Sequence, residues 1–407
     1  MEAKIFLLDE DFNLIKQVDD YISLIWCERF IEFSAVDLEL PATIENIELY
    51  KEERYIFRKI DKNAYYQLTP MFKINNVEIE TNEEKDDTLI VGGIDLRAIT
   101  EQVTIPGKVN HTEMVDVYAW IKATVNNIFS TETEKSETDI NRSDFPFFQM
   151  ENFKISPGYW VPVKTDFLSD KEDEILSEHI FHILKNGNVG WSIKYDTDYG
   201  NKIFWFVLYQ GLDRSVTQNE NAKILFSADF ENLQNTKKST SIDDFKNVAI
   251  VKHNYKDKLN DSGFLIVTNE NQDVRGFNRY SILVDGTEIE LESTNADDVV
   301  TFKEKLRALG LSELNKYKKS KKFECGIIPN DLKYKTDFYL GDIVSVKTRY
   351  GELFDGRIIE VIETFDETGY SIEPVLEYIE RPVIENALKT NNDEYLLTEA
   401  GEYIIYT

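Results

Sequence analysis

The sequence is poor in cysteine, proline and glycine for its length. Its 407 residues include 2 Cys, 9 Pro and 18 Gly. So little glycine and proline excludes a collagen-like or low-complexity chain. Cys27 and Cys325 lie far apart and indicate neither a disulfide framework nor a zinc knuckle. We therefore expect both cysteines to be small buried hydrophobic residues.

Long apolar runs and catalytic motifs are also missing. The longest apolar stretch, residues 203–208, suits a buried strand and is far shorter than the roughly 20 residues of a membrane span. The first thirty residues are acidic, without the basic start of a secretory signal. The sequence lacks a Gly-x-Ser-x-Gly elbow, a phosphate-binding loop and a His-Glu-x-x-His motif. It therefore predicts no catalytic, cofactor-binding or metal-binding residues, and we expect no enzyme.

Basic residues are heavily outnumbered. The chain has 46 Lys+Arg against 75 Asp+Glu, a net charge of −29. Such a surface repels nucleic acid and anionic membranes, which argues against sequence-specific DNA binding. An acidic wall would still let DNA pass through a conduit without sticking. The main basic cluster is short and suits a helix C-terminus better than a nucleic-acid site; it comprises Lys316, Lys318, Lys319, Lys321 and Lys322.

Apolar and aromatic residues are plentiful, at 42% and 13%. The chain is longer than the length that a single hydrophobic core usually supports, so two to four domains are expected. Val36, Leu38 and Leu40 alternate with acidic residues, the period-2 pattern of a half-buried strand. Thr43 is placed to cap a short helix after that strand. Gly92-Gly93 interrupts another predicted strand and indicates a bulge or a close backbone approach.

Helical periodicity occurs in three regions. It predicts a helix over 114–128 capped by Thr112, a second from Ser169 to Gly187 with Glu172 completing a capping box, and a third over 296–318. A hairpin is expected at 191–209. The sequence thus predicts an α+β, β-rich fold, with β-rich units at both ends and α+β segments between them.

Acidic and histidine residues offer three candidate sites. His179 and His182 are three residues apart on the second predicted helix, beside Glu178, but no third metal ligand is nominated, so a polar helix edge is the simpler interpretation. The acidic run 170–174 suits a helix N-terminus better than a glycan-cleaving carboxylate pair. Asp95 lacks the spacing of a calcium loop.

Several short segments, in this order and spacing, resemble one protein family. They are residues 5–12, 18–26, 33–41, 46–49, 208–215, 226–233, 247–249, 339–344, 357–361 and 370–374. Together they resemble siphophage tail-hub or minor tail proteins, which are baseplate-hub-like and related to the N-terminal part of tail-associated lysins. The likeness covers nearly the whole chain.

The resemblance implies two tube-type β-barrel domains with α+β insertion domains. On this sequence they are a barrel at 1–105, an α+β domain at 106–212, a second barrel at 213–260 and 323–382, an α+β insertion at 261–322 and a tail at 383–407. It also implies a homotrimer at the distal tail tip of the virion. Its expected partners are a distal tail or tube protein, the tape-measure protein and tip or fibre proteins.

The resulting hypothesis is a structural hub that closes or extends the tail tube and forms part of the DNA exit channel. Trp26 is our candidate for an interface anchor, although a buried core tryptophan is an equal alternative. A second hypothesis is binding of host cell-wall carbohydrate through Tyr159, Trp160, Tyr199 and Trp205. A third is a peptidoglycan hydrolase with an unrecognised carboxylate pair, and a fourth is the hub of a contractile injection particle. The chain stops about 25 residues after Pro382, so we expect any lytic activity to belong to another protein.

Overall fold

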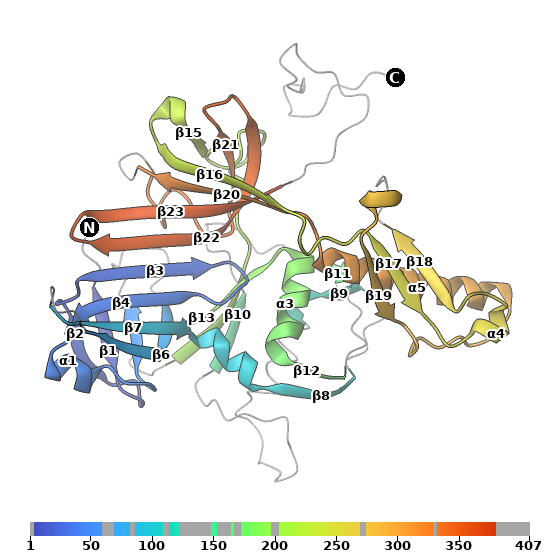
Figure 1. Ribbon diagram of the computed structural model, residues 1–407, viewed down its shortest axis with the longest axis horizontal. Coiled ribbons are helices and arrows are strands. Elements are labelled where there is room, and N and C mark those ends of the chain that lie inside the picture. Colours follow the sequence, from blue (N-terminus) through green and yellow to red (C-terminus); the bar gives the residue numbers. More distant parts are fainter. Residues whose placement is uncertain are drawn as a thin grey trace, which may run out of the picture.

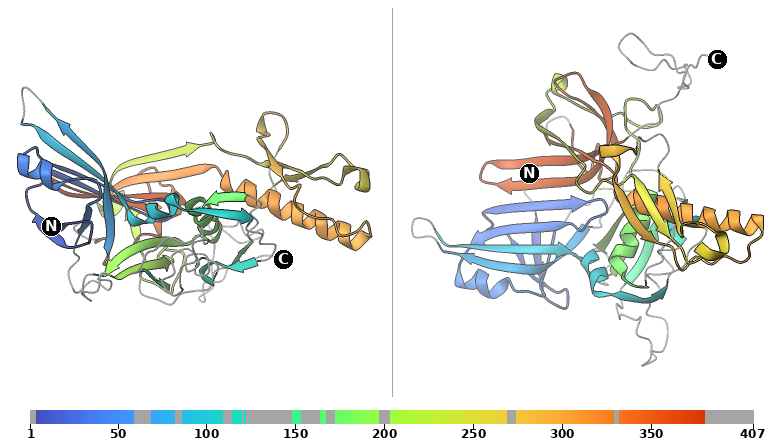
Figure 2. Two further views of the ribbon diagram at one scale, coloured as in Figure 1. Left: turned by 90° about the horizontal axis from the view of Figure 1, so that it is seen from below. Right: turned by 45° about the vertical axis from the view of Figure 1, so that its right-hand side comes forward.

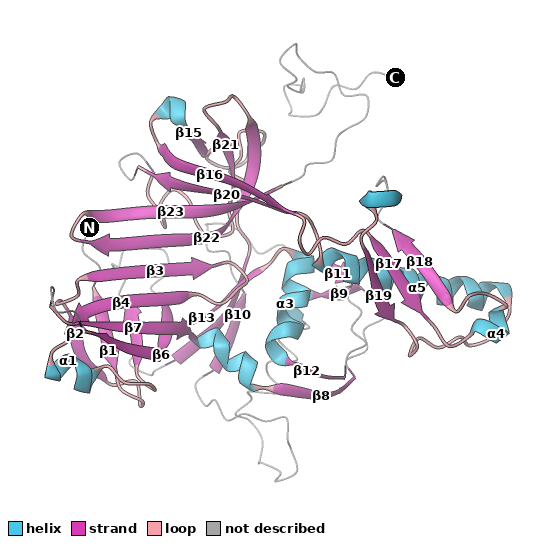
Figure 3. Ribbon diagram, viewed as in Figure 1, coloured by secondary structure: helices cyan, strands magenta, loops and turns pink. Residues whose placement is uncertain are grey.

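The fold is α+β and rich in strands, as the sequence predicts (Figures 1 and 3). The computed structural model describes residues 4–58, 69–81, 86–108, 114–119, 121, 148–152, 164–166, 172–196, 203–268, 274–328 and 332–379. The expected tail at 383–407 lies outside the described residues.

The first β unit is an antiparallel sheet with the strand order β2-β1-β5-β6-β7-β4-β3. It curls around a core that includes Trp26, Leu38 and Phe72. Its elements are β1 (Ile5–Leu8), β2 (Leu14–Val18), β3 (Ser23–Arg29), β4 (Ala35–Pro41), α1 (Ile44–Leu49), β5 (Tyr55–Arg58), β6 (Thr69–Glu80), β7 (Thr88–Asp95) and the 3-10 helix η1 (Leu96–Gln102).

The second β unit has the strand order β15-β21-β22-β23-β20-β16. It encloses its own core, which includes Phe226, Phe323 and Ile358. Its elements are β15 (Leu225–Ser227), the 3-10 helix η2 (Ala228–Phe230), β16 (Leu233–Ser241), β20 (Ser320–Ile327), β21 (Ile343–Lys347), β22 (Leu353–Asp366) and β23 (Gly369–Tyr378).

The two units are joined edge to edge. β3 pairs antiparallel with β22, which makes one continuous 16-stranded sheet. The sheets are not closed into the two barrels that the resemblance implies. Among the described strands no pairing joins β2 to β3 or β15 to β16. One end of each sheet is a short strand, β2 with five residues and β15 with three.

Beside the first β unit, and joined to it through β6, lies a smaller α+β layer that includes α3 (Leu176–Gly187) (Figure 1). Its strands are β8 (Thr104–Lys108), β9 (Met114–Asp116), β10 (Phe148–Asn152), β11 (Lys164–Asp166), β12 (Glu172–Ile175), β13 (Gly190–Asp196) and β14 (Ile203–Tyr209). β13 and β14 form the expected hairpin, and β13 also pairs with β6. Helix, hairpin and first β unit share one apolar cluster.

Two predicted helix starts in this layer are wrong. The helix predicted from Ser169 begins at Leu176, because Glu172–Ile175 pairs with β8 as strand β12. Residues 114–116, predicted as helix, form β9 and pair with β11; residues 117–119 are helical. In both places strand pairing with a distant segment overrides a local helical pattern.

A separate lobe projects from the end away from the first β unit (Figure 2). It contains β17 (Val248–Lys252), α4 (Lys256–Leu259), β18 (Phe264–Thr268), the 3-10 helix η3 (Gly276–Asn278), β19 (Ser281–Asp285) and α5 (Ala296–Lys316). The sheet order is β18-β17-β19, and α5 packs on one face through Phe302, Leu306 and Leu309. β17 lies within the range expected for the second barrel, 213–260, but Ala249 and Val251 belong to the core of this lobe.

Candidate functional site: the seam between the two β units

Buried charges concentrate where the two β units meet. At the end of β5, Arg58 Nη2 lies 2.6 Å from Glu363 Oε2 of β22 and 3.8 Å from Glu28 Oε1 of β3. Lys335 Nζ lies 2.5 Å from the same Glu28 oxygen. Arg58 and Glu363 are only 7% and 5% exposed. Two cations thus face two carboxylates in the interior, which is the condition for keeping such charges buried.

Aromatic side chains enclose this cluster and satisfy its oxygens. Trp26 Nε1 donates to Glu28 Oε1 at 2.9 Å, and the Tyr334 hydroxyl donates to Glu28 Oε2 at 3.3 Å. The Tyr370 hydroxyl donates to Glu363 Oε1 at 3.0 Å. The Arg58 guanidinium also lies 5.0 Å from the centre of the Trp26 ring. Each carboxylate is therefore held by a cation and by a neutral donor.

The protonation states of the cluster follow from burial and from these neighbours. Burial alone would lower the pKa of Arg58, but Glu363 and then Glu28 more than offset it, so its pKa is raised above the usual value. Burial, reinforced by the nearby carboxylates, raises the pKa of Tyr334 and of Tyr370. Arg58 therefore stays charged and both phenols stay neutral donors across the physiological range.

A second cluster fixes the entry into the second β unit. Asp342 is fully buried, and its Oδ2 accepts from Arg214 Nε at 2.7 Å and from the Tyr339 backbone N–H at 3.0 Å. Its Oδ1 accepts from the Leu212 N–H at 2.7 Å. This one carboxylate joins residues 208–215 to residues 339–344, two of the segments that carried the family resemblance.

Glycine is required where those two segments meet. A Cβ on Gly211 would lie 1.9 Å from the Gly341 carbonyl oxygen, too close for any side chain. Gly341 has φ +92°, which disfavours other residues. Its carbonyl accepts from Arg357 Nη1 at 2.8 Å, and the Arg357 guanidinium lies 5.4 Å from the centre of the Phe30 ring. The close approach of the two backbones therefore depends on this pair of glycines.

A third cluster ties the first β unit to β13. Asp95 Oδ2 accepts from Arg97 Nη2 at 2.6 Å and from the Ser34 N–H at 2.6 Å, and its Oδ1 accepts from the Arg97 N–H at 2.9 Å. Arg97 Nη1 donates to the Trp191 carbonyl at 3.0 Å. Asp95, which the sequence did not nominate as a calcium ligand, thus caps η1 and pairs with a buried arginine.

The candidate interface anchor Trp26 is fully buried at this seam. Its indole packs edge-on against Phe72 with ring centres 4.6 Å apart, and its N–H is bound to Glu28. The single chain gives the ring no exposed surface. A role of Trp26 at a contact between subunits stays a prediction, and it would have to act through neighbouring residues.

The histidine pair is buried on α3. His179 is fully buried, and His182 Nε2 lies 3.2 Å from the Ser312 hydroxyl of α5, which links the middle layer to the projecting lobe. The polar helix edge expected from the sequence is therefore wrong, because both rings face the interior. The described part of the chain contains no group of three or more His, Cys, Asp or Glu side chains placed to hold a metal ion.

The basic cluster is split between two elements. Lys316 lies in the last turn of α5 and pairs with Glu313 at 2.7 Å, as a helix-end cation. Lys319 Nζ lies 4.9 Å from the centre of the Phe245 ring, and Lys321 and Lys322 belong to β20. The helix-end interpretation therefore holds for Lys316, whereas Lys321 and Lys322 lie at the start of strand β20.

Other sequence predictions are placed as follows. Both cysteines are free and buried, as expected, and burial is the main cause that raises the pKa of each thiol. Tyr159, Trp160 and Tyr199, the candidate sugar-stacking residues, lie outside the described residues, as do the side chain of Trp205 and the side chains of the acidic run 170–174. None of the helices described is both long and apolar enough to cross a membrane.

Sequence reasoning missed the seam. Arg58 and Glu363 are 305 residues apart, and Glu28 is 306 residues from Tyr334 and 307 from Lys335. The only local signal was an isolated charge within an apolar strand, as with Glu28 after Trp26-Cys27 and Glu363 after Val361-Ile362.

No curated protein has a sequence that matches this chain significantly. Among solved structures, the tail protein from Neisseria meningitidis MC58 is similar, with 9% identity, a TM-score of 0.50 and coverage of 93% of this chain and 97% of that chain. The 43 kDa tail protein of prophage MuSo2 from Shewanella oneidensis has 12% identity, a TM-score of 0.47 and coverage of 93% and 98%. The neisserial likeness shows the fold alone.

The family is shown by the sequence itself. The model of the Siphovirus ReqiPepy6 Gp37-like protein family matches residues 4–376, which is nearly the whole chain. That span includes both β units, the middle layer, the projecting lobe and all three buried clusters. The chain therefore belongs to the Siphovirus ReqiPepy6 Gp37-like protein family.

Proposed function

We propose that this chain is the hub subunit at the distal tip of a siphophage tail, where three copies form a ring around the DNA exit channel. The observation that carries the proposal is the rigid joint between two β units of similar build. Each unit curls around its own core, and the β3–β22 pairing and the buried Arg58 cluster hold the two in one orientation.

The continuous sheet supplies a geometry for the ring. The run β6-β7-β4-β3-β22-β23-β20-β16 crosses both units without a break. Among the described strands β16 pairs only with β20, which leaves one edge open. Three copies would contribute six β units, and each would act as one tube-type barrel whose edge is completed by its neighbour. Pairing of edges in a closed ring also prevents uncontrolled association.

The charge of this sheet supports a DNA conduit. Register and alternation place one face of the run away from both cores, and acidic side chains predominate on that face. The acidic ones are Asp37, Glu39, Glu78, Glu80, Glu324, Glu360, Glu373 and Glu377; basic ones include Arg29, Lys73, Lys237 and Lys322. An acidic channel wall repels the DNA backbone and lets it pass.

In this function the chain is structural and acts through contacts with other tail proteins. The ring would meet the distal tail or tube protein on one side and tip or fibre proteins on the other, with the tape-measure protein ending at its channel. No catalytic role is proposed, and wall degradation would fall to another component of the virion.

The first test is the mass of the purified protein in solution, measured by light scattering over a range of protein and salt concentrations. A species near three times 47.4 kDa is expected. A strict monomer that also fails to form rings on purified tail tubes would contradict the hub. Electron microscopy of tails made with and without the protein then locates it, because the proposal requires the missing density to lie at the distal end.

A further inference from the structure

A bulge and a glycine create a gap on the acidic face of the first β unit. Gly92 of β7 lies between Asp37 of β4 and Asn76 of β6 in the strand register. The register shift between Ile74 and Asn76 inserts Asn75 as an extra residue, so Asn75 and Asn76 are both exposed while Ile74 is buried. Two carboxamides and one carboxylate therefore border a position that has no side chain.

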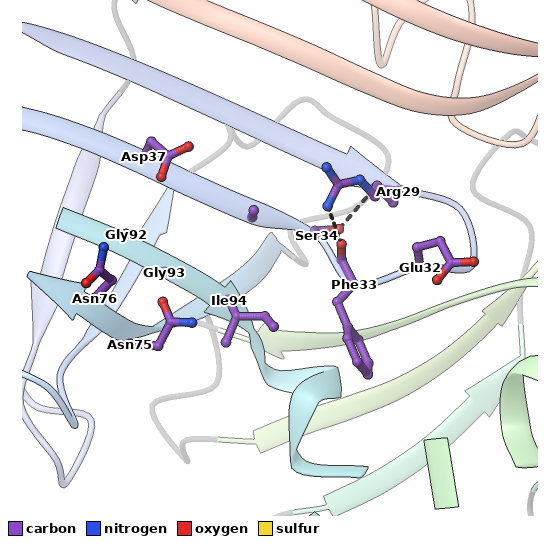
Figure 4. Close-up of a pocket in the computed structure, with 11 residues that line it drawn as sticks. Arg29, Glu32, Phe33, Ser34, Asp37, Asn75, Asn76, Gly92, Gly93 and Ile94 are labelled. Atoms are coloured by element: carbon purple, nitrogen blue, oxygen red, sulfur yellow. Dashed lines mark hydrogen bonds between the residues drawn. The ribbon is translucent and has the colours of Figure 1, made fainter. Parts of the chain in front are cut away.

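This gap is the floor of a pocket of about 430 Å³ (Figure 4). A Cβ on Gly92 would lie 3.6 Å from Asp37 Oδ1 and 3.9 Å from Asn75 Oδ1, so both oxygens converge on the same empty point. Arg29 and Phe33 line one end. Figure 4 shows the Phe33 ring pointing away from the polar side chains, and it packs against Phe181 with ring centres 5.1 Å apart.

Two of the polar side chains that line the pocket, those of Asp37 and Asn75, are without a partner among the described residues. Neither the Asp37 carboxylate nor the Asn75 amide makes a hydrogen bond or ion pair with any residue in the described ranges, whereas the Asn76 amide nitrogen donates to Glu78 at 3.0 Å. The cation at the rim is already engaged, since Arg29 Nε lies 3.3 Å from Glu360 Oε2 and Arg29 Nη1 donates to the Phe33 carbonyl at 2.7 Å.

The donor set selects the class of ligand. A calcium ion takes 6–8 oxygens, usually from several carboxylates, and one carboxylate with two carboxamides is too few. A sugar ring usually stacks on an aromatic face, and Phe33 is turned away. A lysine ammonium or an arginine guanidinium needs only a carboxylate and neutral acceptors, and the surrounding acidic face attracts it.

We propose that the pocket over Gly92 binds a lysine or arginine side chain of a basic protein segment that lies along the acidic face of the sheet. Asp37 would accept two N–H bonds, and the Asn75 and Asn76 carbonyls would accept the others. If the ring proposed above is correct, that segment occupies the channel before DNA passes. Binding itself does not rest on the ring, because all the residues involved belong to one chain.

The test uses the full-length protein and short capped peptides that carry one arginine, with the neutral citrulline analogue as the matched ligand. Affinity is followed by NMR through the Gly92 amide and the side-chain amides of Asn75 and Asn76. The arginine peptide is expected to shift these signals and the citrulline peptide is not. Asp37→Asn should weaken binding about tenfold, the loss of one partly desolvated charge-assisted contact.

Two variants separate this pocket from general attraction to an acidic surface. Glu39→Gln removes the same charge two residues along the same strand, outside the pocket, and should change affinity less than about twofold. Gly92→Val fills the gap, and its thermal unfolding checks that the sheet is intact. Equal losses from Asp37→Asn and Glu39→Gln would overturn the proposal. The proposal would also be overturned if calcium or an N-acetylglucosamine tetramer bound in a way that depends on Asp37 while the arginine peptide did not bind. Because the readout needs no assembly, a protein that stays monomeric, forms no ring on purified tail tubes and still binds the peptide would reject the ring and retain the pocket.

Discussion

Replacing Arg58 by methionine tests whether the buried cluster holds the two β units together. Methionine retains much of the apolar stem but removes the charge that lies 2.6 Å from Glu363. Glu363 would then keep only the Tyr370 hydroxyl, at 3.0 Å, among its described partners, whereas Glu28 would keep Lys335. Removing one partner of a buried ion pair costs about 3–5 kcal/mol. Arg58→Met should therefore lower the free energy of unfolding by about that amount.

Urea unfolding followed by tryptophan fluorescence measures the change, because Trp26 lies against the Arg58 guanidinium. Lys185→Met is the matched control: its pair with Glu32 is 2.7 Å long, but both side chains are more than half exposed, so the loss should stay below about 1 kcal/mol. A double variant, Arg58→Met with Glu363→Leu, should recover most of the stability because no lone charge remains buried. Equal losses from Arg58→Met and Lys185→Met would refute this account of the seam.

Three further outcomes are expected. Gly211→Ala forces a Cβ into a carbonyl oxygen and should destabilise the protein by about 3 kcal/mol in the same unfolding assay. Burial raises the pKa of Cys27 and Cys325 above 9.0, so the folded thiols stay protonated while those of the unfolded chain ionise. Stability is therefore lost as pH rises above 9.0, and replacing both with alanine should reduce that loss in unfolding curves measured between about pH 8 and pH 10, below the range where buried tyrosines such as Tyr370 contribute. Ser312→Ala removes the hydroxyl partner of His182. Hydrogen exchange should then show that the free energy of local opening where α3 meets α5 falls by about 1 kcal/mol.

Elements governed by local chemistry were predictable from the sequence. Thr43 caps α1 by accepting the Asn46 N–H, as its position before the helical segment indicated. The predicted third helix matches α5 within two residues, since its apolar side chains face one sheet. Gly92-Gly93 indicated a bulge or a close backbone approach, and the structure has a bulge on the partner strand β6, opposite Gly92. Sequence shows that a glycine relieves crowding but not which strand carries the extra residue.

Features set by distant pairing were not predictable. The acidic run after Ser169 locally predicts a helix start. Glu172–Ile175 instead forms a strand because it pairs with β8, about 65 residues earlier. The segments around residues 211 and 341 carried the family resemblance, and the structure shows that backbone N–H groups of both donate to the buried carboxylate of Asp342. No periodicity in one segment encodes a bond that is completed some 130 residues later.

The placement of charge at the seam explains why the joint is ionic rather than purely apolar. In the pairing of β3 with β22, Arg29 lies opposite Glu360 on the outer face, and Arg58 holds Glu363 on the inner face. A slip of one residue would turn each of these carboxylates to the opposite face, away from its cation. An apolar seam could match this stability but would discriminate less between registers. In the proposed ring the two β units occupy successive positions and need one fixed angle, which ion pairs on both faces of β22 would help to set.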